Sequence, residues 1–398
     1  MSRRKHILII CNEYPSSTRV GGIGRFSKTL TDALVKNSYQ CTIIGLYSDI
    51  DSDQDYYQKN GVRVVKLVVK RSIPGFGFFW GKIRLSNCIK KINEKDKIDL
   101  IEAPDYEGSY WLLKDIKVPK VVRLHGSETY FRTILKERLK WIHKIIEKKS
   151  ILKANAIISV SDYTLKETLK IFNIKKESYL TSTIYNPIDI SYIDKVMDKL
   201  KEKTVKNRIL YTGTFIRKKG VIDLFKSLEY VFHKIDDAHI ICVGPDSHDI
   251  KTNNESTFEV AMKILSKKYH DRVKFLGPKP HGQLLKNLMS ASVCVYPSYL
   301  EAYPLSWLEA MSMSKPIVAS NTGSGREVID DGESGFLCHP KEHEKMAKKI
   351  IKILKNDKIA LKLGSQARYE VENSNNIDTL IKKNIDFFHH VMDNFENG

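Results

Sequence analysis

Two glutamates flank a short apolar segment whose spacing could serve a phosphorylated sugar. The segment EAYPLSWLE has Glu301 and Glu309 at its ends. Pro304 suits the first position of a helix, which we predict to run through residue 311. The first free amides of that helix, those of Leu305 and Ser306, would face an anion together with the positive end of the helix dipole. The segment therefore predicts a phosphate site.

The two carboxylates would lie on opposite sides of that phosphate site. Glu309 is five residues into the predicted helix from Pro304, which is about 7 Å along its axis. At that distance a carboxylate can accept hydrogen bonds from both hydroxyls of a ribose, whereas Glu301 would face a sugar. The alternative is that both are surface glutamates beside an amphipathic helix, and the spacing favours neither interpretation.

A lysine beside a glycine stands at a second predicted turn from strand to helix. In GTFIRKKGVIDLF, Lys219 precedes Gly220 where a helix begins. A fixed ammonium group and helix amides can neutralise a departing diphosphate as a metal ion would. The alternative is a solvated basic turn that contains Arg217, Lys218 and Lys219.

Two weaker candidates lie in the first half of the chain. In RVGGIGRFS, Gly22 and Gly24 would let the backbone approach an anion at a helix start. Ser27 replaces the third glycine of a dinucleotide fingerprint there. In VVRLHGSE, His125 follows a strand and could bond a sugar hydroxyl or a phosphate. A packed histidine is the alternative.

The sequence predicts no metal site and no resident cofactor. The acidic stretch DSDQD has Tyr56 and Val62 where a calcium loop needs glycine and glutamate. No Walker loop, Gly-x-Ser-x-Gly motif or zinc-ligand spacing occurs.

Strands and amphipathic helices alternate along both halves of the chain, which predicts two doubly wound α/β domains with parallel sheets. A charged segment, 185–208, is the predicted connector, and the tail from about 377 to 397 is a predicted helix. Ligands of such proteins bind at the carboxyl ends of strands, so we expect the site in a cleft between the domains. The predicted strands are 5–11, 40–46, 62–69, 98–103, 118–124, 156–160, 209–213, 238–244, 273–277, 292–298 and 316–320.

Length and charge limit the class of protein. A chain of 398 residues exceeds the usual size of one core, and no segment has the roughly 18 unbroken apolar residues of a spanning helix. Its 66 basic and 47 acidic residues give a formal charge of +19. Nucleic acid, an anionic membrane, a phosphorylated small molecule or mere lysine-rich composition could each explain that charge. Six scattered cysteines, mostly in apolar runs, favour buried thiols in a reducing cytoplasm.

With these motifs the chain resembles the family 4 glycosyltransferases, which are retaining, nucleotide-sugar-dependent enzymes of the GT-B fold. The resemblance covers nearly the whole chain and rests on GGIG, HGSE, NPID, KKG, YPSYLEAYPLSWLEAM, KPIVAS and GSGREVIDDGESGFL. It implies two Rossmann-like domains that face across a cleft. The acceptor-side domain would be 1–190, with the helix 377–398 crossing back to it, and 191–376 would bind the nucleotide sugar.

The resemblance also implies a role for each candidate residue. Glu301, His125 and Lys219 would be catalytic: Glu301 faces the donor sugar, Lys219 binds the diphosphate, and His125 contacts sugar or phosphate. The family often has arginine where this chain has Thr214, which leaves open whether another residue supplies that phosphate cation. The implied donor-binding residues are Gly22, Gly24, Thr214, Lys219, Leu305, Ser306 and Glu309.

The implied chemistry is a metal-independent front-face substitution. The leaving diphosphate helps to deprotonate the acceptor hydroxyl, so that no protein nucleophile is required, and the site orients the reactants and stabilises developing charge. The implied partners are a UDP- or GDP-sugar and a glycan or lipid-linked acceptor, as in the synthesis of bacterial surface polysaccharides, without nucleic acid.

Two segments in the first half combine basic and apolar residues. They are KRSIPGFGFFWGKIR (70–84) and the predicted helical region 131–153. Such segments suit an anionic lipid surface, so we expect a cytoplasmic protein that docks on the inner face of the membrane. The alternative is that the aromatic side chains pack inside.

Two other classes of function compete with the transferase. A dinucleotide-dependent enzyme is suggested by the opening β-α-β unit and Asp49, but it leaves the pair of glutamates at 301 and 309 unexplained. A nucleic-acid-binding protein is suggested by the charge of +19, but it requires a dense basic stripe, whereas acids are interspersed here.

Overall fold

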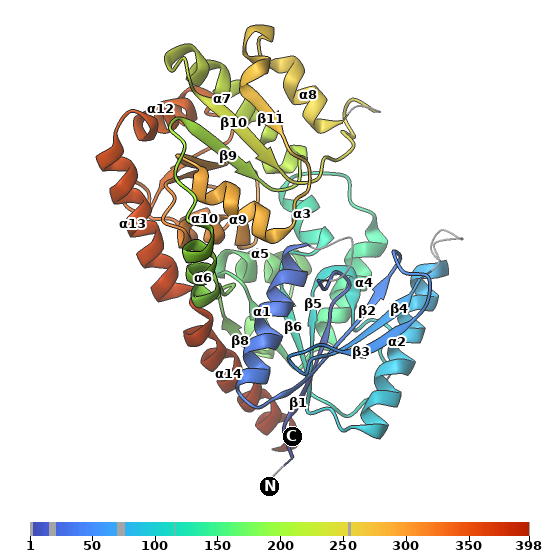
Figure 1. Cartoon of the computed structure of the whole chain (residues 1–398). Coiled ribbons are helices and arrows are strands. Elements are labelled where there is room, and N and C mark those ends of the chain that lie inside the picture. Colours follow the sequence, from blue (N-terminus) through green and yellow to red (C-terminus); the bar gives the residue numbers. More distant parts are fainter. Residues whose placement is uncertain (1–2, 16–20, 70–75, 115, 254–255, 398) are drawn as a thin grey trace. The chain divides into compact units, whose positions relative to one another are not determined.

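The computed structural model describes residues 3–15, 21–69, 76–114, 116–253 and 256–397 (Figure 1). The chain divides into two compact units. Unit 1 comprises Met1–Pro187 and Ile377–Gly398, and unit 2 comprises Ile188–Asn376. Each unit contains one sheet with helices packed on it, as the alternating sequence pattern predicts.

Unit 1 contains an eight-stranded sheet in the order β3-β4-β2-β1-β5-β6-β7-β8. Every pairing is parallel except that of β3 with β4. The chain builds outward from β1 on one side and then resumes with β5 on the other, so β1 and β5 flank the switch point where α/β sheets bind ligands. The strands are β1 (His6–Ile10), β2 (Gln40–Tyr47), β3 (Gln54–Tyr57), β4 (Arg63–Val68), β5 (Leu100–Pro104), β6 (Lys120–Leu124), β7 (Ala156–Ser159) and β8 (Leu180–Thr183).

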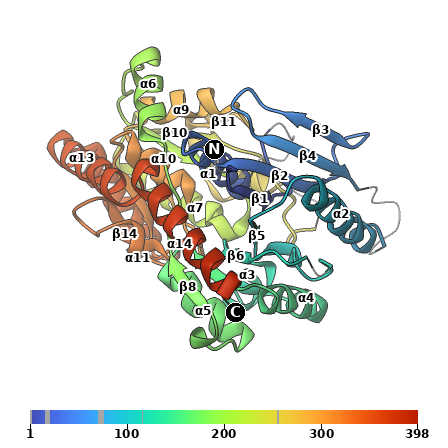
Figure 2. The ribbon, with the colours of Figure 1, turned by 90° about the horizontal axis from the view of Figure 1, so that it is seen from below.

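Helices cover this sheet, and therefore its central strands are buried along their whole length, as in β1. Apolar side chains of α2 and α5 form one core with those of β1 and β5. The last helix, α14, packs on α1 and so belongs to unit 1 (Figure 2). The helices are α1 (Gly22–Lys36), α2 (Phe76–Lys95), the 3-10 turn η1 (Tyr106–Gly108), α3 (Glu128–Ile134), α4 (Trp141–Leu152), α5 (Asp162–Phe172), the 3-10 turn η2 (Lys176–Ser178) and α14 (Ile377–Asn397).

A buried ion pair ties α14 to the sheet. Arg123, on β6, donates from Nε and Nη2 to the two carboxylate oxygens of Glu102 at 2.8 Å each. The same Nη2 donates to Oδ1 of Asn384 on α14 at 2.6 Å. The guanidinium also lies over the ring of Phe26, 4.7 Å from its centroid. One guanidinium therefore connects β5, β6, α1 and α14, which come from distant parts of the chain.

Unit 2 contains a parallel six-stranded sheet in the order β11-β10-β9-β12-β13-β14. Its switch point lies between β9 and β12 by the same argument. The strands are β9 (Arg208–Thr212), β10 (His239–Val243), β11 (Val273–Phe275), β12 (Val293–Tyr296), β13 (Ile317–Ser320) and β14 (Phe336–Cys338). The helices are α6 (Ile190–Leu200), the turn η3 (Arg217–Lys219), α7 (Val221–Lys234), α8 (Thr257–Ile264), the turn η4 (Lys267–Arg272), α9 (His281–Ser290), α10 (Leu305–Ser312), α11 (Gly325–Val328), α12 (His343–Leu354) and α13 (Asp357–Ser374).

Five elements differ from the sequence-based expectation. The predicted helical region 131–153 is interrupted, because α3 ends at Ile134 and α4 begins at Trp141. The predicted connector contains helix α6, which buries only Ile190 and Ile193 and is capped by the Asp189 side chain, so its apolar signal is weak. Strands β3, β8 and β14 were not predicted. The first two are exposed or half-buried edge strands, and β14 has three residues, so none carries a long apolar run.

No helix in the described part of the chain has the length and apolar character that crossing a bilayer requires.

Candidate active site

Lys219 and Glu301, which are 82 residues apart, meet at the switch point of unit 2. The Lys219 Nζ donates to Oε1 of Glu301 at 2.6 Å. Lys219 ends η3, which follows β9, and Glu301 lies in the loop between β12 and α10. Their side chains are 26% and 10% exposed, so the pair is partly accessible to a ligand. A cation and a carboxylate are thus held together at the carboxyl edge of the sheet.

A glycine allows these two loops to approach each other. Gly220 has φ of 70°, and a Cβ there would stand 1.8 Å from the carbonyl oxygen of Pro297. The Tyr299 amide donates to the Lys218 carbonyl oxygen at 2.8 Å, which joins the loops directly. Only glycine fits both the backbone conformation and the space, so Gly220 fixes where Lys219 lies relative to Glu301.

The buried carboxylate of Asp223 binds the loop that carries Tyr299 and Glu301. The Tyr299 hydroxyl donates to Oδ2 of Asp223 at 2.8 Å, and Nε2 of His343 lies 2.7 Å from the other carboxylate oxygen. Asp223 lies in the first turn of α7, the helix whose N-cap is Gly220. Burial, followed by the bond to Asp223, raises the pKa of Tyr299, so its hydroxyl keeps its proton and remains the donor.

The backbone of Glu301 is held by the segment GSGRE. Gly323 has φ of 57° and packs closely on Glu301. A Cβ added to Gly323 would stand 2.8 Å from the Glu301 carbonyl oxygen. The hydroxyl of Ser324 donates to that oxygen at 3.4 Å. The family motif around residue 323 therefore supports the backbone of the glutamate.

Helix α10 begins one residue later than predicted. Pro304 is its N-cap residue, and Leu305 and Ser306 are its first two residues, so helix geometry leaves their amides without a partner inside the helix. Trp307 is fully buried and anchors the helix in the core. The start of α10 thus follows the loop that leaves the carboxyl end of β12, and the phosphate site there stays a prediction.

Glu309 is buried on the next turn of α10 and contacts a histidine that sequence reasoning missed. Its Oε1 lies 2.9 Å from Nε2 of His281, at the start of α9. The His281 ring stacks on Tyr192 of α6, with centroids 6.0 Å apart and planes inclined by 8°. A sequence signal for His281 did exist, because it follows the predicted strand 273–277 and therefore lies near the carboxyl end of that strand, where ligands bind. Tyr192 gave no signal because it lies in the predicted connector.

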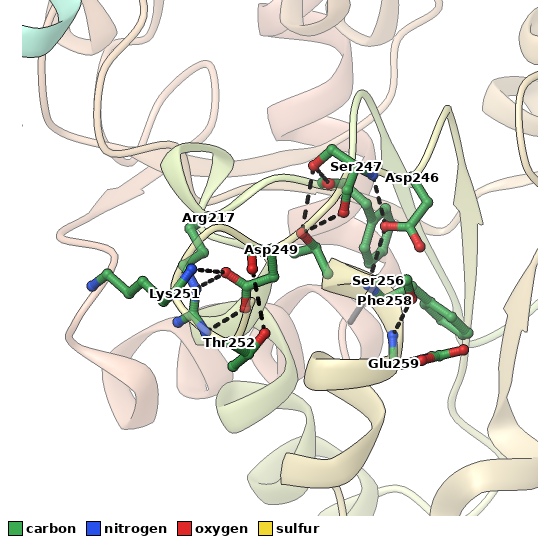
Figure 3. A network of polar contacts seen from close by, with 11 residues as sticks. Arg217, Asp246, Ser247, Asp249, Lys251, Thr252, Ser256, Phe258 and Glu259 are labelled. Atoms are coloured by element: carbon green, nitrogen blue, oxygen red, sulfur yellow. Dashed lines mark hydrogen bonds and ion pairs between the residues drawn. The ribbon is translucent and has the colours of Figure 1, made fainter. Parts of the chain in front are cut away.

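Arg217, the cation three residues after Thr214, is paired with a carboxylate of the chain. Arg217 donates from Nε and Nη2 to the two oxygens of the buried Asp249 at 2.6 and 2.5 Å (Figure 3). The amide of Lys251 donates to that carboxylate as well, so Arg217 organises the loop after β10. Thr214 accepts the Tyr211 hydroxyl through its carbonyl oxygen. The sequence leaves open whether Arg217 or Lys218 supplies the phosphate cation missing at Thr214, and in the structure Arg217 is already paired with Asp249.

The candidates of unit 1 lie at the carboxyl edge of its own sheet. His125 follows β6, is half-buried, and donates its amide to Oδ1 of Asp105 at 2.9 Å. Its ring packs edge-on against Phe26, with centroids 4.7 Å apart. Burial, and then the Arg123 charge, lowers the pKa of His125 to about 3. The imidazole is therefore neutral and suited to hydrogen bonding.

The glycine loop of unit 1 is closed by a carboxylate of the chain. Gly22 begins α1, and Gly24 lies inside it. The Gly24 amide donates to Oε1 of Glu13 at 3.1 Å, and a Cβ on Gly24 would stand 1.8 Å from the Glu13 carbonyl oxygen. Burial raises the pKa of Glu13, although the amides of Gly24 and Ile23 act in the opposite direction. The Gly24 amide, which was expected to bind an anionic ligand, thus donates to the carboxyl group of Glu13.

Two family models match adjacent parts of the chain. The model described as Glycosyltransferase Family 4 matches residues 20–192, and the model described as Glycosyl transferases group 1 matches residues 193–370. An uncharacterized glycosyltransferase of Methanocaldococcus jannaschii is 24% identical and covers 97% of this chain and 98% of its own length. The capsular polysaccharide biosynthesis glycosyltransferase CapM of Staphylococcus aureus is 24% identical over 58% of this chain and 60% of its own length.

Solved structures share the fold over nearly the whole chain. Sucrose-phosphate synthase from Thermosynechococcus elongatus superimposes with a TM-score of 0.82 at 20% identity, covering 98% of this chain and 99% of its own. Anabaena HepE in complex with UDP and glucose gives 0.69 at 17% identity, covering 96% and 98%. By its two matched models and its two Rossmann-like sheets, the chain belongs to the family 4 glycosyltransferases (glycosyl transferases group 1) and has the GT-B fold.

Proposed function

We propose that this glycosyltransferase moves a hexosyl group from a UDP- or GDP-sugar to an acceptor hydroxyl with retention of anomeric configuration and without a metal ion. The observation that carries the proposal is the 2.6 Å contact of Lys219 with Glu301 at the switch point of unit 2. It supports a site in which Lys219 binds the diphosphate and Glu301 faces the transferred sugar. Glu309 then binds the ribose, and entry of the donor displaces His281 from it.

The proposed reaction needs no nucleophile from the protein. The bond from the anomeric carbon to the diphosphate oxygen breaks while the acceptor oxygen bonds to the same face of that carbon. The acceptor proton passes to the departing diphosphate. Lys219 and the amides of Leu305 and Ser306 stabilise the charge that develops on this group, as preorganised cations and dipoles do in general. His125, held neutral by burial, serves as a hydrogen-bonding group for the sugar or phosphate.

The proposed acceptor is a glycan or a lipid-linked oligosaccharide of a bacterial surface polysaccharide. Support comes from the capsular polysaccharide enzyme CapM, which is similar over 58% of this chain. Support for a nucleotide-sugar donor comes from HepE, whose structure holds UDP and glucose.

A donor screen tests the proposal. Thermal shift and hydrolysis are measured for UDP-, GDP-, ADP- and TDP-sugars in EDTA, on the wild type and on Lys219→Ala and Glu301→Gln. We expect one nucleotide to stabilise the wild type, Lys219→Ala to weaken that shift, and Glu301→Gln to bind but turn over about a hundredfold more slowly. A melting temperature that no nucleotide sugar changes, or turnover that EDTA abolishes, would contradict the proposal.

A further inference from the structure

One helix of unit 1 exposes an apolar stripe to solvent. Residues 141, 145 and 152 of α4 recur at the spacing of one helical face, and residue 142 adjoins them. The opposite side of α4 is already buried through Ile146 and Ile151, so the stripe is not needed for the core of unit 1. The exposed apolar side chains are Trp141, Ile142, Ile145 and Leu152, with exposed fractions of 72%, 38%, 39% and 52%.

The same face of α4 is positively charged. The only acidic residue of this helix, Glu147, is buried and accepts the amides of Glu128 and Thr129 at 3.1 and 3.0 Å. The exposed face therefore offers no carboxylate to a cationic partner. The basic residues on this face or next to it in sequence are Lys136, Arg138, Lys140, Lys144, Lys148, Lys149 and Lys153, and the exposed Glu137 is the one acid among them.

The start of α2 extends this surface. Phe79 and Trp80 are 43% and 55% exposed. The Phe79 ring packs edge-on against Trp111, with centroids 6.2 Å apart. Lys153, one residue beyond α4, donates from Nζ to the Trp111 carbonyl oxygen at 3.0 Å. Exposed aromatic groups of α2 therefore lie beside the end of α4, while residues 70–75 of the predicted basic segment lie outside the described part of the chain.

We propose that the exposed face of α4, with Phe79 and Trp80 of α2, docks on an anionic membrane surface. The apolar stripe would enter the interface while the lysines reach the lipid phosphates, as amphipathic helices with basic flanks do. Charge complementarity favours this occupant, because within α4 the exposed face carries lysines and no exposed acid, and in the segment before α4 the exposed Glu137 is outnumbered by Lys136, Arg138 and Lys140. Glu147 links α4 to the amides that follow His125, so docking would bring lipid near that candidate residue.

The docking surface deepens the proposed function by placing the acceptor on a membrane, but its test is independent of the donor. Flotation compares vesicles of phosphatidylcholine alone with vesicles containing about 30% phosphatidylglycerol, at about 50 mM and about 500 mM salt. The variants are W141S/I145S, which removes the stripe, and K144E/K149E, which reverses charge. The matched control is L361S/Y369S on α13 of unit 2, where the two side chains are 70% and 58% exposed.

We expect the wild type and the α13 control to float with anionic vesicles at low salt and to be released by high salt. Each α4 variant should lose about tenfold or more of the bound fraction, with an unchanged melting temperature because exposed side chains are replaced. Absence of flotation at low salt, or equal loss in the α13 control, overturns the proposal. So does dissociation of a lipid-free dimer by W141S/I145S, which would assign the face to a second copy. If the nucleotide sugar still raises the melting temperature of the variants that fail to float, the donor proposal stands although the docking proposal falls.

Discussion

Replacing Gly220 by alanine should uncouple Lys219 from Glu301. A Cβ at this position would stand 1.8 Å from the Pro297 carbonyl oxygen, whereas real Cβ atoms stay beyond 3.0 Å. The two loops must therefore separate by about 1.2 Å, the difference between these distances. A misplacement of about 1 Å in a catalytic constellation costs about a hundredfold in rate. The left-handed backbone of alanine adds about 1 to 2 kcal/mol of destabilisation.

The assay is kcat/KM for hydrolysis of the donor that the screen identifies, with the melting temperature measured in parallel. Gly332→Ala is the matched control, because Gly332 has φ of 93° and no atom within 4 Å of an added Cβ. The control should lose about 1 kcal/mol of stability and keep its kcat/KM. Gly220→Ala with kcat/KM within about threefold of the wild type would refute the claim that this contact positions the two residues.

Three further substitutions probe other contacts. Burial raises the pKa of Asp105 to about 8, so the folded chain holds this proton more tightly than the unfolded chain does. The stability that the proton contributes is therefore lost as pH rises from about 4 to about 8. Asp105→Asn should make the melting temperature less dependent on pH over that range. Arg123→Met leaves the buried Glu102 without its cation and should cost about 3 to 5 kcal/mol in denaturant unfolding. Tyr299→Phe removes a bond to Asp223 and should cost about 1 kcal/mol of stability, with about a tenfold fall in kcat/KM.

Each of these predictions has a result that contradicts it. For Asp105→Asn it is a pH dependence equal to that of the wild type. For Arg123→Met the control is Arg132→Met, which breaks the half-buried pair with Glu128 and should cost about 1 kcal/mol. An equal loss in both variants would count against the buried pair. For Tyr299→Phe, unchanged kinetics would show that the Asp223 network does not position the loop.

The sequence predicted the folding pattern because that pattern is local. Buried parallel strands appear as short apolar runs, and the central strands of both sheets were found from them. The edge strands β3 and β8 were missed because β3 is mostly exposed and β8 is only half-buried, so neither carries an apolar run. The start of α10 was predicted to within one residue because proline and the turn before a helix have local signatures.

By itself, then, the sequence determined the family, the α/β class and the residue types at each strand end, because motif spacing and apolar periodicity are properties of neighbouring residues. The tertiary structure decided which side chains meet: Lys219 with Glu301, Arg217 with Asp249, and Glu309 with His281. It also decided that α4 turns an apolar stripe outward. These pairings depend on crossover connections that bring residues tens of positions apart to one sheet edge, and no local pattern encodes which partner is reached.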